Sequence, residues 1–180
     1  MIPSGATLKP SEIVRPARKF WPVSDFVLVC FVVTLALATA VKATQQYQHR
    51  HARSRLVKEL TTAASGFRAY MRETGVTPES ANSGEVPAGM APFLASVSWT
   101  APTPLGGFYR WIRIPVDKSK GDILAAGRIE ITSFPSGPAL VLSDADLLEI
   151  DQQIDDGDLS TGIFRTGFNG WPVLLVRVTP

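Results

Sequence analysis

The sequence of 180 residues is 45% apolar and 19% charged, and it contains one cysteine. This length allows one domain with an appendage, and the composition excludes a disordered chain. A single cysteine excludes an intramolecular disulfide framework and any multi-cysteine metal site. Residues 1–74 carry eleven Lys and Arg against four Asp and Glu, whereas residues 75–180 carry seven against twelve. This split predicts a basic stem that meets an anionic surface, followed by a mildly acidic head.

An apolar segment near the N-terminus predicts a transmembrane helix over residues 22–41. Residues 26–41 contain no charge, and the twenty residues 22–41 would span about 30 Å as a helix, the thickness of the bilayer hydrocarbon. Trp21 precedes the segment and Lys42 follows it, and both residue types are favoured at the membrane interface. Because the uncharged run is short, Asp25 is expected near the interface or against a partner.

Two other interpretations of the apolar segment remain open. A helix that is apolar all round also occurs in protein cores, although a domain of this size seldom buries one. The basic residues before the segment, and Ala38-Thr39-Ala40 within it, are typical of a cleavable secretory signal. We favour the transmembrane anchor because the helical pattern continues beyond this cleavage point.

Residues 42–74 are predicted to continue the same helix in amphipathic form. Apolar residues recur at helical spacing along one face: Leu56, Leu60, Ala63, Ala64, Phe67, Tyr70 and Met71. No proline interrupts residues 23–77, so nothing there forces a break. Gly66 suggests a bend, and Gly75 predicts the end of the helix.

Between the two halves of this helix lies a predicted basic collar: Lys42, Arg50, Arg53, Arg55 and Lys58. The collar is expected to be solvated and to face anionic lipid headgroups. Nucleic acid is not an expected partner, because Tyr47 alone supplies a base-stacking aromatic ring among these charges. His49 and His51 point to different faces of a helix, so they cannot chelate one metal, and both are expected to be solvated.

A globular head is predicted for residues 75–180. It begins with a long Gly- and Pro-rich loop over 75–107. Residues 108–114 and 127–134 then show the alternation of half-buried strands, and we expect them to form a hairpin that turns within 117–122. In the second strand the alternation assigns one set to the core and another to solvent: Ile129 and Ile131 inward, and Arg128, Glu130 and Thr132 outward.

The rest of the head predicts one short helix and one terminal strand. Residues 139–142 are a brief apolar run that is either a strand or a lead-in. Ser143 is a credible N-cap for a helix that ends near Asp155. Residues 171–178 predict a strand, with Pro172 near its start, where proline is tolerated.

These elements together predict an α+β fold. In it, a long N-terminal helix, first membrane-spanning and then amphipathic, packs on a small antiparallel sheet with one short extra helix. The layout resembles that of type IV pilins and type II secretion pseudopilins. Three stretches are also similar to those of a bacterial subgroup of such prepilin-like proteins: VPAGMAPFL (86–94), WTAPTPLGG (99–107) and IDQQIDDGDLSTGIFR (150–165).

The resemblance implies a filament-type subunit anchored in the bacterial inner membrane. Residues 1–21 would be a basic cytoplasmic segment, and the head would lie in the periplasm. The implied partners are like subunits, or other pilins and pseudopilins, bound through the N-terminal helix. The alternative is an anchored periplasmic module that recognises a surface, a substrate or DNA without polymerising.

One departure from the family pattern concerns processing by the prepilin peptidase. The family has Gly before the cleavage point and Glu at the fifth mature position. Asp25 takes the acidic place if Trp21 is the first mature residue, but Phe20 then stands where Gly belongs, so cleavage and N-methylation stay open. In the family the acid is thought to pair with a neighbour's N-terminal amine. Without cleavage, Asp25 would need Lys19 or Arg18 of a neighbour, unless it only caps the helix.

The sequence carries little other chemistry. Four acidic residues suggest calcium in the head: Asp151, Asp155, Asp156 and Asp158. Their spacing fails the EF-hand pattern, because Asp156 occupies the glycine position and Gly162 the position of the final Glu. We therefore expect no cofactor, with calcium in the head as the less favoured alternative. No catalytic Ser/His/Asp set or phosphate-binding loop appears in the sequence, so an enzyme is not expected.

Overall fold

The computed structural model describes residues 23–115, 125–134, 137–167 and 169–177. The chain divides into two compact units, Met1–Ala43 and Thr44–Pro180, and helix α1 (Val23–Thr74) has residues in both. The second unit also contains these elements: β1 (Phe108–Arg113), β2 (Ala125–Thr132), α2 (Asp144–Ile154), β3 (Phe164–Thr166) and β4 (Pro172–Arg177). The predicted α+β fold, with one long helix, an antiparallel sheet and a short helix, is confirmed.

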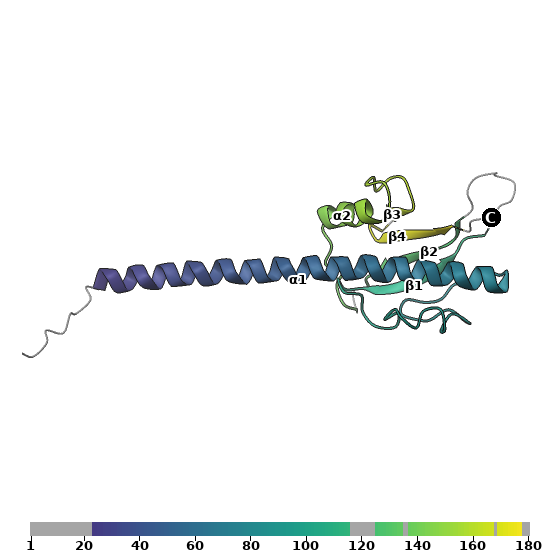
Figure 1. The fold of residues 1–180 in the computed structure, drawn as a ribbon, viewed down its shortest axis with the longest axis horizontal. Coiled ribbons are helices and arrows are strands. Elements are labelled where there is room, and N and C mark those ends of the chain that lie inside the picture. The colour runs from purple at the N-terminus through teal and green to yellow at the C-terminus, as the bar shows by residue number, and fades with distance from the viewer. Residues whose placement is uncertain (1–22, 116–124, 135–136, 168, 178–180) are drawn as a thin grey trace, which may run out of the picture. The chain divides into compact units, whose positions relative to one another are not determined.

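The four strands form one antiparallel sheet in the order β1-β2-β4-β3 (Figure 1). The predicted pairing of the first two strands is confirmed, from Phe108 opposite Thr132 to Arg113 opposite Gly127. The turn expected within 117–122 lies outside the described residues. Strand β3 was not predicted, because three residues are too few to show a strand period.

The core of the second unit forms where one face of α1 packs on the sheet. The predicted stripe is buried there, with Leu56, Leu60 and Phe67 no more than 1% exposed. The Phe67 ring stacks on Trp111 of β1 at 3.9 Å between ring centroids and lies 5.5 Å from Trp99. Tyr70 lies at the edge of this core, where its ring contacts Phe93.

The two glycines of this region have different roles. Helix α1 continues through Gly66, where an added Cβ would lie 2.4 Å from the Phe93 carbonyl oxygen. Gly66 therefore permits a close approach of the following loop. Gly75 ends the helix as predicted: its φ is 71° and its N–H donates to the Met71 carbonyl at 2.9 Å.

The predicted alternation of β2 is correct for its core face and wrong for its outer face. Ile129 and Ile131 are buried as expected, but Glu130 and Thr132, assigned to solvent, are also buried. The Thr132 hydroxyl lies 2.7 Å from Ser83 Oγ, in the loop before β1. That loop also runs beside the free edge of β1, where Gly84 N–H donates to the Tyr109 carbonyl. Because the loop that covers this face is distant in sequence, the sequence of β2 itself shows no periodic signal for the burial of Glu130 and Thr132.

A buried polar contact joins the middle of α1 to β1. The Tyr109 hydroxyl donates to Glu59 Oε2 at 2.9 Å, and Arg55 Nε donates to Glu59 Oε1 at 2.9 Å. Burial and the neighbouring Glu59 carboxylate raise the pKa of Tyr109, so the phenol stays protonated and keeps donating. The two donors satisfy the carboxylate of Glu59, which lies on the core face of α1.

A fragment lacking residues 1–44 is expected to be soluble and to unfold cooperatively on heating, because the buried part of α1 starts beyond this cut. A fragment lacking residues 1–61 is the control. It loses Leu56, Glu59 and Leu60, and should not fold. Circular dichroism and gel filtration measure both properties. If the fragment lacking residues 1–44 is insoluble or unfolded, the division between the apolar segment and the head is contradicted.

Candidate functional site

The first part of α1 is apolar and exposed around its whole circumference. Eleven large apolar residues between Val23 and Val41 are 46–80% exposed. The helix is long and apolar enough to cross a membrane, with a mean hydropathy of 2.4 over eighteen residues that are 0% buried. On an insertion scale, eleven such side chains favour the membrane by about 3–7 kcal/mol.

Polar side chains inside this segment are satisfied by the helix itself. The Thr34 hydroxyl donates to the Cys30 carbonyl at 2.7 Å, and the Thr39 hydroxyl to the Ala36 carbonyl at 2.8 Å. Hydroxyls bonded in this way can lie in hydrocarbon without an unmet donor. Cys30 is a free, exposed thiol in the middle of the segment.

Asp25 is the third residue of α1 and lies in its first turn, so it is not the N-cap that the alternative interpretation expected. In the first turn, its carboxylate lies near the positive end of the helix dipole. Among the described residues it has no ion pair, and Ser24 Oγ at 3.4 Å is a weak donor. The proposed partners Lys19 and Arg18, and the processing positions Phe20 and Trp21, lie outside the described residues.

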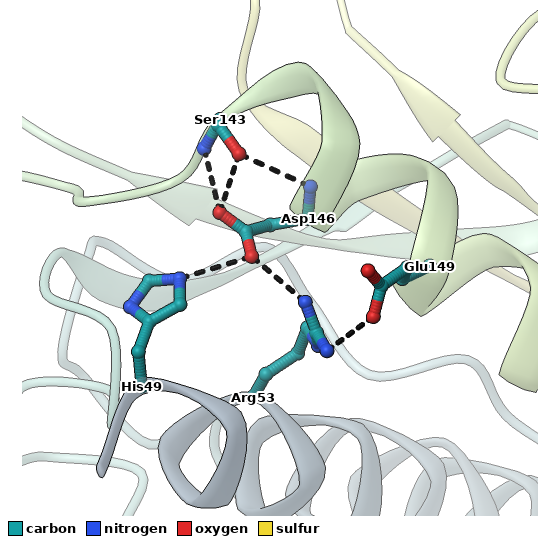
Figure 2. Close-up of polar contacts among 5 residues, drawn as sticks. All are labelled: His49, Arg53, Ser143, Asp146 and Glu149. Carbon is teal, nitrogen blue, oxygen red and sulfur yellow. Dashed lines mark hydrogen bonds and ion pairs between the residues drawn. The ribbon is translucent and has the colours of Figure 1, made fainter. Parts of the chain in front are cut away.

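A second group of polar residues joins α1 to α2, and we call it the α1–α2 polar cluster: His49, Arg53, Ser143, Asp146 and Glu149 (Figure 2). Asp146 Oδ1 lies 2.9 Å from His49 Nε2 and accepts a hydrogen bond from Arg53 Nη1 at 2.9 Å. The second terminal nitrogen of Arg53, Nη2, forms an ion pair with Glu149 Oε2. One carboxylate oxygen thus holds two side chains that are one helical turn apart on α1.

The N-terminus of α2 explains why Asp146 is placed there. The Ser143 hydroxyl accepts from Asp146 N–H, while Asp146 Oδ2 accepts from the Ser143 amide and hydroxyl, which is a capping box. Burial would raise the pKa of Asp146. The bonds from Ser143 and the nearby His49 outweigh it and hold that pKa well below its usual range.

This cluster corrects two predictions. His49 was expected to be solvated, but its side chain is 34% exposed and contacts Asp146. Arg53 was assigned to the solvated collar, but only 12% of its side chain is exposed. The sequence does carry a signal for this burial, since His49 and Arg53 extend the spacing of Leu56 and Leu60 along the same face. His51 is exposed as predicted, and its ring contacts Tyr47.

The acidic residues singled out as a calcium alternative do gather at the end of α2. One carboxylate oxygen from each of Asp151, Asp155 and Asp156 lies within 4.8 Å of the others. Asp158 is not in this group, and its Oδ1 accepts from the Ser160 amide and hydroxyl. The spacing of these acids still does not match the EF-hand pattern. Even so, the fold brings three of the four predicted acids together, which sequence spacing alone could not establish.

Comparison with family models, curated proteins and solved structures finds no match for this chain.

Asp146→Asn should lower the free energy of unfolding by about 2 kcal/mol at neutral pH, because hydrogen bonds to a charged group are lost. The folded pKa of Asp146 is depressed, so its contribution is present above the unfolded value of about 4 and is lost as pH falls towards the folded value. The difference between wild type and variant should therefore shrink below about pH 4. Urea denaturation from pH 7 to 3 measures it.

Asp144→Asn is the matched control, since Asp144 is exposed in the same first turn and interacts with the helix dipole. Its loss should be about 0.3–1 kcal/mol. Equal losses in the two variants, or a difference that does not change with pH, would refute the role given to Asp146.

Proposed function

We propose that the chain is a membrane-anchored, pilin-like structural subunit of a type IV pilus or a type II secretion-type filament. Its head would lie in the periplasm and its anchor in the bacterial inner membrane. The observation that carries this proposal is helix α1. The one helix includes an apolar segment exposed on every side and, further along, the face that completes the core of the head.

The exposed apolar segment needs a nonaqueous environment, because a soluble protein rarely leaves so large an apolar surface uncovered. A bilayer or the helices of neighbouring subunits would supply it. The satisfied hydroxyls of Thr34 and Thr39 fit either environment. Lys42, Arg50 and Lys58 are exposed after the segment, where they would meet anionic headgroups.

Subunits of such a filament should associate through α1, which two tagged copies of the full chain can test. Co-expressed copies are expected to co-purify from membranes, and a bis-maleimide should cross-link them through Cys30, the one cysteine of the chain. Cys30→Ala is the control and should remove the cross-link while co-purification persists. Membranes that yield neither co-purification nor cross-links would contradict a polymerising subunit.

A second candidate is the anchored binding module that does not polymerise. The observation in its favour is a hollow of about 270 Å³ on the outer face of the sheet, lined in part by Arg110, Arg128, Glu130 and Trp171. Arg128 forms an ion pair with the Glu130 carboxylate at 2.8 Å, so Arg110, in the same lining as the Trp171 ring, is the cation that would hold an anionic group. A chain that stays monomeric in the membrane would favour this candidate.

Asp25 distinguishes a subunit contact from a local helix effect. If Asp25 pairs with Lys19 or Arg18 of a neighbour, its loss costs about 3–5 kcal/mol of association. If it only interacts with the helix dipole, the cost is about 0.3–1 kcal/mol. We expect Asp25→Ala and Asp25→Asn to reduce co-purification with wild type more than about tenfold.

The control for both Asp25 variants is the melting temperature of the head, which should not change. Recovery of Asp25→Asn at the level of wild type would rule out the ion pair, because Asn keeps the size of the side chain and loses only its charge.

A further inference from the structure

The hollow on the outer face of the sheet has a floor made by three neighbouring strands. Arg110 and Ile112 belong to β1, Arg128 and Glu130 to β2, and Val173 to β4, and all five line its volume of about 270 Å³. The register places Glu130 opposite Arg110 on one side and opposite Val173 on the other. The side chains of this row therefore meet on the face opposite to the one that packs on α1.

The connection between β3 and β4 forms one wall of the hollow and presents Asn169 and Trp171. Gly167 N–H donates to the Trp171 carbonyl at 2.7 Å, and Gly170 N–H donates to the Gly167 carbonyl at 3.0 Å, so backbone hydrogen bonds fasten this connection. The Trp171 ring also contacts Phe134 in an edge-to-face arrangement, with 5.4 Å between the ring centroids. The indole ring and the Asn169 amide are therefore held beside the strand floor.

Arg110 is the cation of this hollow that has no protein partner. Among the described residues no ion pair involves Arg110, although Glu130 lies directly opposite in the sheet. Glu130 Oε1 instead pairs with Arg128 Nε at 2.8 Å, and Glu130 Oε2 receives no hydrogen bond from the described residues. Two arginines and one glutamate give the lining a net charge of +1. The hollow can therefore accept one negative charge, through Arg110.

These groups fit a carboxylate that is carried on a hydroxylated ring. A guanidinium binds a planar carboxylate through two parallel N–H···O bonds. A phosphate with two negative charges fits less well, because its second charge would lie beside the Glu130 carboxylate. Glu130 Oε2 can accept from a hydroxyl group of the ligand, and the Asn169 amide offers both a donor and an acceptor. The Trp171 ring offers an apolar face to the C–H groups of a sugar ring.

We propose that the hollow binds a uronic acid residue of an acidic polysaccharide, with its carboxylate on Arg110 and its ring against Trp171. The volume of about 270 Å³ lies just below the range of about 300–1,000 Å³ that is usual for small-molecule sites, so the hollow holds one sugar residue. A polymer presents many such residues, so several copies of the head on one membrane would bind it more tightly than one copy does.

This inference deepens the binding-module candidate and rests on it, and its failure would leave the filament proposal standing. Every lining residue belongs to the second unit, and none of them lies in α1. Co-purification of two tagged copies tests association through α1, whereas the titration below tests the hollow alone, so the two failures are distinguishable.

The test is a titration of the full chain in detergent with sodium glucuronate. It follows the indole N–H signal of Trp171 by NMR, and Trp171→Phe assigns this signal by removing it. We expect the signal to shift with a Kd on the order of 1 mM, since one ion pair and one ring contact hold the ligand. The signal of Trp99 should stay in place, because its indole N–H donates to the Glu85 carbonyl inside the head at 2.8 Å.

Four other compounds separate a sugar acid from related ligands. Glucose lacks the carboxylate, acetate lacks the ring, and phosphate lacks both, so each should bind at least about tenfold more weakly than glucuronate at equal ionic strength. An aspartate blocked at both ends represents an acidic peptide and should also bind more weakly. Equal or tighter binding of glucose, phosphate or the blocked aspartate would overturn the choice of a uronic acid.

Arg110→Gln removes the charge from the floor of the hollow and should weaken glucuronate binding at least about tenfold. Arg113→Gln is the matched control in the same strand and should bind as wild type does, because Arg113 pairs with Glu79 and does not line the hollow. An unchanged Trp99 signal shows that each variant is folded. The proposal is overturned if glucuronate up to about 10 mM, ten times the expected Kd, leaves the Trp171 signal unmoved, or if Arg110→Gln binds as tightly as wild type.

Discussion

The head depends on the contact between one face of α1 and the apolar face of the sheet. Phe67 stacks on Trp111, and Leu56, Leu60 and Ala63 fill the space along the same face. A small sheet with one apolar face is not stable until something covers it. Because α1 provides this cover, residues 44–74 belong to the folding unit of the head and are more than a connecting stem.

Polar contacts on the same face determine how α1 lies on the sheet and on α2. Near the start of the buried face, His49 and Arg53 hold Asp146, and further along, Glu59 accepts from Tyr109. A buried carboxylate without its donors costs several kcal/mol, so rotating or sliding α1 would be penalised at both points. The apolar stripe supplies most of the attraction, and the polar contacts select one register.

Much of this fold could be predicted because the signals are local. The apolar stripe gives α1, the alternation gives β1 and the core face of β2, and Ser143 with the acids after it gives the start of α2. Strand β3 could not be predicted, since three residues show no period. The burial of Thr132 depends on Ser83, 49 residues away in sequence, and so leaves no local trace.

The same limit explains the errors at the candidate sites. His49 and Arg53 find their partner Asp146 at separations of 97 and 93 residues, which composition and spacing do not reveal. Asp151 is more instructive, because it shares the buried face of α2 with Leu147 and Ile150. An acid at a core position of an amphipathic helix is visible in the sequence and marks a group that needs a proton, a partner or an ion.

The intact mass of the chain extracted from bacterial membranes tests most directly whether α1 anchors the head. We predict that the protein resists carbonate extraction and that its measured mass includes residues 22–41, whether the chain is whole or starts at Trp21. A soluble periplasmic product that starts at Val41 or Thr44 would show that the apolar segment is a cleaved signal and would contradict membrane anchoring by α1.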